Sequence, residues 1–193
     1  MFKRLYDWLM ALAEGPYASV ALVCVAFAES SFFPLPPDLL LAPMALAKPR
    51  AAWFYAFIAT VGSVVGGAFG YWIGAALYDS LGQWLIHLYG YQDRMAALKQ
   101  TYADYGAWVI LLKGLTPIPF KIVTIGSGLL GYPFWTFIGL SILTRGARFF
   151  IVASALHRWG DPLRAALERH FASFVLTMLA IVVIGFYLAI KVF

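Results

Sequence analysis

The chain has 193 residues, of which 63% are hydrophobic and only 12% are charged, and its mean hydropathy is +0.81. A soluble domain of this length would expose far too much apolar surface, so the composition excludes a soluble protein and indicates an integral membrane protein. The formal net charge of +5 fits the basic flanks of membrane helices, and we expect no nucleic acid partner.

The beginning of the chain predicts a helix that lies on the membrane surface. Residues 1–15 have a basic start, and Asp7 and Glu14 interrupt their apolar part. This pattern favours an interfacial amphipathic helix over a cleaved signal peptide. No polar or Ser/Gly-rich linker follows, so residues 1–193 are expected to form a single membrane domain. The one cysteine, Cys24, excludes a disulfide framework within the chain.

Three apolar stretches are long enough to cross a bilayer, which takes about 20 mostly apolar residues. They are Ala51–Leu77, Pro133–Leu156 and Phe171–Ile190. The first contains a glycine stripe, in which every fourth residue is glycine: Gly62, Gly66, Gly70 and Gly74. Small residues at this spacing share one helical face and let another backbone approach closely. We predict tight helix packing along the glycine stripe, the alternative being a groove that faces substrate.

Two further apolar stretches, Tyr17–Ala47 and Ala107–Gly131, are interrupted by prolines. Proline removes a backbone donor and clashes with the preceding turn, and the freed backbone groups cannot face lipid. We therefore expect each stretch to form a re-entrant helical hairpin whose break is buried in protein or lines a wet cavity. The predicted breaks lie at Pro34, Pro36, Pro117 and Pro119.

The two halves of the chain share this order of elements. The proline pairs are 83 residues apart (117 − 34), and the prolines before the following spans, Pro49 and Pro133, are 84 apart (133 − 49). A repeat of interrupted helices is typical of transporters and predicts repeats over residues 17–77 and 107–156. Because each repeat crosses the membrane an odd number of times, the two should be inverted.

The predicted fold is therefore an all-α integral membrane protein. It contains an inverted repeat of two re-entrant helical hairpins, each followed by a spanning helix, plus an N-terminal amphipathic helix and a C-terminal spanning helix over residues 171–190. The distribution of basic residues favours a cytoplasmic N-terminus. That orientation puts seven of them on the cytoplasmic side: Lys3, Arg4, Lys48, Arg50, Arg158, Arg164 and Arg169. Three lie outside: Arg94, Lys99 and Lys191. The mixed-charge segments 78–106 and 157–170 are expected to be solvent-side or interfacial connections.

Six ionisable residues fall at membrane depth: Glu29, Asp38, Lys113, Lys121, Arg145 and Arg148. Each costs on the order of 2.5–3.5 kcal/mol at the bilayer centre, so such residues face a wet interior or one another. Two acids against four bases leave an excess of two positive charges, which favours an anionic partner. Because lysine and arginine are the usual phosphate binders, we expect the four bases to bind a substrate phosphate.

The two acids have a separate expected role. A carboxylate in low dielectric favours its protonated form, whereas a nearby cation favours the ionised form, so Glu29 and Asp38 are candidates for proton coupling. Three alternatives stay open. The first is that the charges only pair internally. The second is that Asp38 is the N-cap of the helix that follows it, and the third is that Arg145 and Arg148 reach an interface by snorkelling.

No motif predicts an enzyme. The sequence contains no Gly-x-Ser-x-Gly, no His-Glu-x-x-His and no Walker loop. The histidines, His87, His157 and His170, lack the spacing of metal ligands. We therefore expect no catalytic residue, no metal site and no cofactor.

At these motifs the sequence resembles the DedA family, whose core is the VTT (SNARE-associated) domain. The stretch ESSFFPLPPD, from Glu29 to Asp38, is similar to the family's acidic first motif, and the glycine-rich helix with Tyr71 also fits. The stretch KGLTPIPFK, from Lys113 to Lys121, is similar to the second motif. Members usually carry arginines around a single proline there, and the lysines and two prolines of this chain are similar to the smaller YqaA-like branch.

The resemblance implies lipid translocation in a bacterial inner (cytoplasmic) membrane, with Glu29, Asp38, Lys113 and Lys121 as the essential residues. Bacterial relatives are linked to undecaprenyl phosphate recycling, phosphatidylethanolamine flipping and proton-dependent fitness. We therefore expect a multi-pass transporter of a phosphate-bearing lipid, with protons as the coupling ion. One alternative is a transporter or channel for small ions, either an oxyanion or a proton-exchanged cation. Another is a non-transporting assembly factor. For any of these functions the chain could form a homo-oligomer.

Overall fold

The computed structural model describes residues 15, 17–33, 36–89, 92–115, 120–160 and 180. The predicted helix over residues 1–15 lies outside them except for Gly15, and the predicted span 171–190 except for Ala180. Pro34, Pro117 and Pro119 also lie outside. The described part of the chain contains helices and no strand, so the all-α class is confirmed there.

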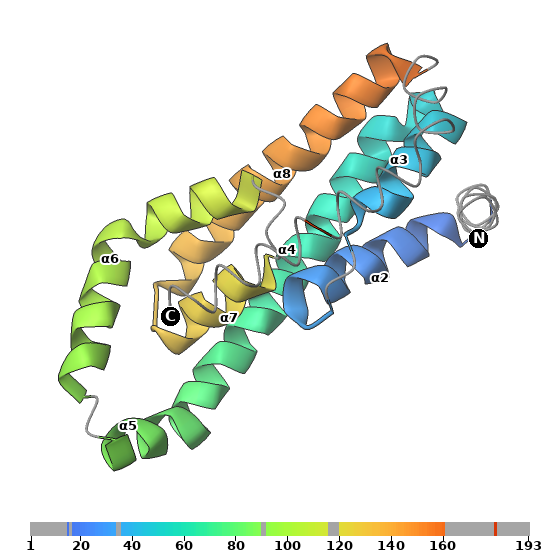
Figure 1. Ribbon diagram of the computed structural model, residues 1–193. Helices are drawn as coiled ribbons and strands as arrows, with labels where there is room; N and C mark the ends of the chain where they lie inside the picture. The colour runs from blue at the N-terminus through green and yellow to red at the C-terminus, as the bar shows by residue number, and fades with distance from the viewer. Residues whose placement is uncertain are drawn as a thin grey trace.

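The described helices are arranged around two long ones, α4 and α8, which run side by side (Figure 1). In chain order they are α2 (Ala18–Ser31), α3 (Asp38–Ala47), the 3₁₀ helix η1 (Pro49–Ala51), α4 (Ala52–Leu77), the π-helical turn η2 (Tyr78–Gly82), α5 (Gln83–Tyr89), α6 (Gln92–Leu115), α7 (Lys121–Leu129) and α8 (Phe134–Arg158).

Helices α4 and α8 have the length and composition of membrane spans. The continuous helical segment Pro49–Ser80, which contains α4, and α8 are both apolar enough to cross a bilayer. Their bounds agree within two residues with the predicted spans Ala51–Leu77 and Pro133–Leu156. Large apolar side chains point outward from both, which suits a lipid environment. Examples are Trp53, Phe57, Phe69, Trp72, Trp135, Leu143 and Ile151.

Both predicted breaks coincide with ends of helices. Helix α2 ends at Ser31 and α3 begins at Asp38, while α6 ends at Leu115 and α7 begins at Lys121. The two helices that follow the breaks begin 83 residues apart (121 − 38), the same offset as the proline pairs. The re-entrant path of these helix pairs within a membrane stays a prediction.

The predicted connection 78–106 is helical through most of its length. It contains η2, α5 and the first part of α6, which continues through Gly106 to Leu115. The second interrupted stretch therefore begins with a helix of 24 residues rather than with a short arm that starts at residue 107.

The glycine stripe of α4 contacts both α2 and α7. A Cβ atom on Gly62 would lie 2.7 Å from the carbonyl oxygen of Val23 in α2. One on Gly66 would overlap the Phe27 carbonyl of α2, and one on Gly74 would overlap the Ile125 carbonyl of α7. These close backbone approaches require residues without a side chain. Two helices from different halves of the chain thus dock side by side on one face of α4.

Gly70 lies where the two docked helices meet. A Cβ atom there would come within 2.9 Å of the Ser30 carbonyl oxygen and would overlap the Thr124 hydroxyl. That hydroxyl donates a hydrogen bond of 2.9 Å to the Ser30 carbonyl. The end of α2 and the first turn of α7 are therefore joined directly at the midpoint of the glycine stripe.

A tight turn connects α7 to α8. Gly131 has φ +70°, and the Tyr132 N–H donates to the Ser127 carbonyl at 2.9 Å. This is a Schellman cap, in which glycine adopts the left-handed conformation without steric cost. The hydroxyl of Tyr71 in α4 donates to the Tyr132 carbonyl at 2.6 Å. The turn is thus fixed to the central helix.

Candidate functional site

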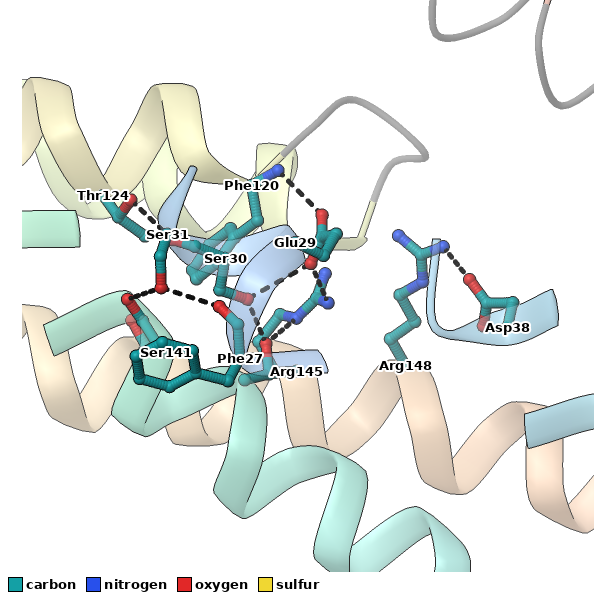
Figure 2. Close-up of polar contacts among 12 residues, drawn as sticks. Phe27, Glu29, Ser30, Ser31, Asp38, Phe120, Thr124, Ser141, Arg145 and Arg148 are labelled. Atoms are coloured by element: carbon teal, nitrogen blue, oxygen red, sulfur yellow. Dashed lines mark hydrogen bonds and ion pairs between the residues drawn. The ribbon is translucent and has the colours of Figure 1, made fainter. Parts of the chain in front are cut away.

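A buried ion pair joins α2 to α8. The Arg145 Nη2 atom lies 2.7 Å from Glu29 Oε2, and the side chains are 1% and 8% exposed (Figure 2). Glu29 lies in the last turn of α2, and Arg145 lies in the middle of α8. A pair so little exposed to water is screened weakly, and removal of either partner leaves an uncompensated charge.

The other oxygen of Glu29 interacts with the start of α7. The Phe120 N–H donates to Glu29 Oε1 at 3.1 Å, and Phe120 immediately precedes α7. The first N–H groups of a helix have no partner within the helix, and α7 has no side-chain cap of its own. A carboxylate at this end also interacts favourably with the helix dipole. Glu29 therefore acts as the cap of α7 through Phe120, a residue 91 positions later in the chain.

Two serines close a ring of hydrogen bonds with this ion pair. Arg145 Nε donates to Ser63 Oγ at 2.6 Å, and Ser30 Oγ donates to Glu29 Oε2 at 3.1 Å. The two hydroxyls are 2.7 Å apart. Because the Ser30 proton goes to Glu29, Ser63 is the donor between them. Ser63 belongs to α4, so the ring connects α2, α4 and α8.

The guanidinium of Arg145 is also covered by aromatic rings. Its Cζ atom lies 5.0 Å from the centre of the Phe120 ring and 4.8 Å from that of Phe149. Cations are attracted to the faces of such rings. These rings and the two side chains that accept its hydrogen bonds, Ser63 and Glu29, hold Arg145 in one position, and snorkelling of Arg145 to an interface is wrong.

Replacing Ser63 with alanine is expected to lower the free energy of unfolding by about 1.5–3 kcal/mol, because Arg145 Nε loses its buried acceptor. Denaturant unfolding of the purified protein in detergent measures this change. The control is Ser154→Ala in α8, where the hydroxyl only donates to the Phe150 carbonyl one turn earlier. Equal losses in the two variants would contradict a specific role for Ser63.

A second ion pair joins α3 to α8. Arg148 Nη2 lies 2.5 Å from Asp38 Oδ2, and the side chains are 15% and 9% exposed. Figure 2 shows these two side chains pointing toward one another, beside the network around Glu29. The other oxygen, Asp38 Oδ1, is buried and has no hydrogen-bond partner among the residues that the structure describes. The expectation that Asp38 is an N-cap is wrong, because Asp38 is the first residue of α3 and makes no capping hydrogen bond.

The two lysines differ from the arginines. Lys121 is the first residue of α7, and its Nζ atom lies 3.4 Å from the Phe32 carbonyl oxygen. In the part of the chain that the structure describes, no carboxylate forms an ion pair with Lys121. Lys113 lies near the end of α6, and its side chain is outside the described residues. Internal pairing thus accounts for both arginines and both acids.

Sequence reasoning missed the groups that connect the charges. These are the Ser30 and Ser63 hydroxyls, the Thr124 hydroxyl and the backbone N–H of Phe120. One signal was present, because Ser63 directly follows Gly62 in a helix that is otherwise nearly all apolar. Within the described ranges, no three His, Cys, Asp or Glu side chains are grouped as metal ligands would be.

A separate cleft lies away from the ion pairs. It has a volume of about 350 Å³ and lies between η2, α5 and α6. Lys99 contributes to its wall and lies 3.7 Å above the centre of the Tyr78 ring. The cleft belongs to the predicted solvent-side connection, which makes Lys99 a useful control for the lysines at the breaks.

Comparisons with known proteins add a family assignment. A model of the VTT domain matches residues 35–158. An uncharacterized protein of Haemophilus influenzae is 30% identical over 188 residues, which cover 97% of each chain. An uncharacterized protein of Histophilus somni is 36% identical over 191 residues, which cover 99% of each chain. No solved structure matches the chain. The region matched by the domain model includes Asp38, Lys121 and both paired arginines.

Proposed function

The chain belongs to the VTT-domain (DedA) family of membrane proteins, and from this premise we propose that it transports a phosphate-bearing lipid across a bacterial inner membrane. Undecaprenyl phosphate and phospholipids such as phosphatidylethanolamine are the candidate substrates. In this proposal the protein is not an enzyme, and protons drive the movement through Glu29 and Asp38.

The observation that carries the proposal is the positive charge left after the acids are paired. Glu29 and Asp38 are each bound to an arginine, which leaves Lys121, among the described residues at the second break, as an excess cation. Lys121 lies in the first turn of α7 with its amine against the Phe32 carbonyl, a neutral partner. A buried or half-buried ammonium favours an anion over a carbonyl, and phosphate supplies one.

The proposed path follows from the same arrangement. The headgroup phosphate binds at Lys121 and Lys113, where α6 gives way to α7, while the acyl chains remain in the bilayer against the outward apolar faces of α4 and α8. Arg145 and Arg148 contribute a positive field, and Arg148 becomes available to the phosphate when its carboxylate partner, Asp38, is neutralised. The headgroup thus crosses beside fixed charges instead of through hydrocarbon, where it is expensive.

Replacing Lys121 with alanine is expected to slow lipid movement roughly 10- to 150-fold, because a charge-assisted hydrogen bond contributes about 1.5–3 kcal/mol. The measurement is the exposure of headgroups at the outer surface of proteoliposomes that contain undecaprenyl phosphate or phosphatidylethanolamine. Lys99→Ala is the matched control, since it removes a lysine from the cleft at η2. Equal rates in wild type and Lys121→Ala would overturn the role of Lys121.

The same vesicles separate the alternatives. Flux of a small anion or cation without lipid movement would replace lipid transport with ion transport. Absence of both, together with a stoichiometric partner that copurifies, would favour an assembly factor. The glycine stripe is already covered by α2 and α7, so such a partner would bind elsewhere.

A further inference from the structure

The two buried acids differ in whether their oxygens are occupied. Glu29 accepts three hydrogen bonds, from the Phe120 N–H at Oε1 and from Arg145 and Ser30 at Oε2. Within the described ranges, Asp38 accepts one hydrogen bond, from Arg148 at Oδ2, and its Oδ1 is buried without a partner. Buried oxygens in native proteins nearly always have partners, so an unpaired one is a position where a proton or a donor can bind.

The position of a proton has different consequences at the two acids. A proton on Oε2 of Glu29 would displace a donor, and a proton on Oε1 would share that oxygen with the Phe120 N–H; either would leave the fully buried Arg145 without its counter-ion. A proton on Asp38 Oδ1 displaces no donor. It also leaves Oδ2 in place for Arg148, which is more exposed than Arg145 and loses less when its partner becomes neutral.

We propose that Asp38 takes up the coupling proton on Oδ1, while Glu29 stays ionised as the fixed partner of Arg145 and the cap of α7. This inference rests on the proposed function and assigns its proton-coupling role to Asp38 alone, while Glu29 has a structural role. In the proton step, a hydronium ion gives a proton to Oδ1: one O–H bond forms at Oδ1, one O–H bond of the hydronium breaks to leave water, and the carboxylate becomes neutral. Its attraction for Arg148 falls, so Arg148 exchanges the carboxylate for a phosphate oxygen of the substrate.

The groups around Asp38 link the two events. Helix α3 packs against α2, η1, α4 and α8. Their ionisable residues are Glu29 and Cys24 on α2, Arg50 on η1, Tyr55 and Tyr71 on α4, and Arg145, Arg148, His157 and Arg158 on α8. A phosphate that engages Arg148 takes its guanidinium away from Asp38, and a proton on Asp38 releases that guanidinium to the phosphate. Proton and phosphate therefore promote each other's binding, as linkage requires.

The test is infrared difference spectroscopy of the full chain in phosphatidylcholine vesicles, at acidic minus neutral pH. The wild type should show the carbonyl band of a buried, neutral carboxylic acid on acidification. The band should disappear in Asp38→Asn and persist at a shifted frequency in Asp38→Glu. It should also persist in the double variant Glu29→Leu with Arg145→Met, which removes the other acid together with its counter-ion. A band that survives in Asp38→Asn, or vanishes in the double variant, overturns the proposal.

Two further readouts keep the test decisive. Circular dichroism checks that Asp38→Asn is folded; if it is not, an unshifted band in Asp38→Glu overturns the proposal and a shifted band supports it. Lipid movement is measured in parallel vesicles that contain undecaprenyl phosphate. A titrating Asp38 band without lipid movement means that the proposed function fails while the proton site stands. Lipid movement with unchanged pH dependence in Asp38→Asn means that the proton site fails while transport stands.

Discussion

Replacing Glu29 with alanine is expected to lower the free energy of unfolding by about 3–5 kcal/mol, as measured by denaturant unfolding in detergent. The change leaves the guanidinium of Arg145 buried without a counter-ion and removes the acceptor of the Phe120 N–H. It also opens the ring that Ser30 and Ser63 complete. The expected loss is large because one carboxylate serves three helices at once.

The control for Glu29→Ala removes both charges. Replacement of a buried ion pair by apolar side chains of similar volume is often neutral or stabilising, so Glu29→Leu combined with Arg145→Met should recover most of the loss. If the double variant is as unstable as Glu29→Ala, the uncompensated charge is not the cause. Unchanged stability of Glu29→Ala would show that the ion pair contributes nothing to the fold.

The second large effect is expected from Gly66→Ala, which should lower the free energy of unfolding by about 1–3 kcal/mol through overpacking. The added Cβ atom would overlap the Phe27 carbonyl, a backbone group that moves only if α2 moves. Displacement of α2 also shifts Glu29 away from Arg145, so lipid movement should fall together with stability. The measurements are thermal unfolding and headgroup exposure on the same preparation.

Gly139→Ala is the matched control for Gly66→Ala. Gly139 also lies within a spanning helix, α8, but a Cβ atom there would meet nothing within 4 Å. We expect a change within about 0.5 kcal/mol or a small gain, because alanine is the better helix former. A loss at Gly139 equal to that at Gly66 would mean that helix contact is not the cause.

The elements that sequence predicted well depend on local signals. Hydropathy located α4 and α8 within two residues, and proline pairs located both interruptions, since proline acts on its own turn. Helix α6 was missed over residues 92–106. Charged and polar residues are distributed all around that segment. It therefore lacks the apolar stripe by which a helix is recognised in a sequence, and it is predicted as a connection.

Four of the six ionisable residues that were selected by their cost at membrane depth form ion pairs in the structure, Glu29 with Arg145 and Asp38 with Arg148. Which residues would pair was not predicted. The choice of arginine for each acid depends on how α2 and α3 are placed along α8, which no local pattern records. The bond from Phe120 to Glu29 involves a backbone N–H, which any residue other than proline supplies, so the sequence carries no sign of it.

The two helices that pack on the glycine stripe become available at different times during synthesis. Gly62 and Gly66 receive α2, which has already been synthesised when α4 leaves the ribosome, whereas Gly74 receives α7. Gly128, the α7 residue against Tyr71, follows Gly74 by 54 residues (128 − 74). At about 5–20 residues per second, half of the stripe is bare for roughly 3–11 seconds. During that interval the nascent chain has an unfilled groove in the bilayer, where insertion factors or lipid must substitute for the missing helix.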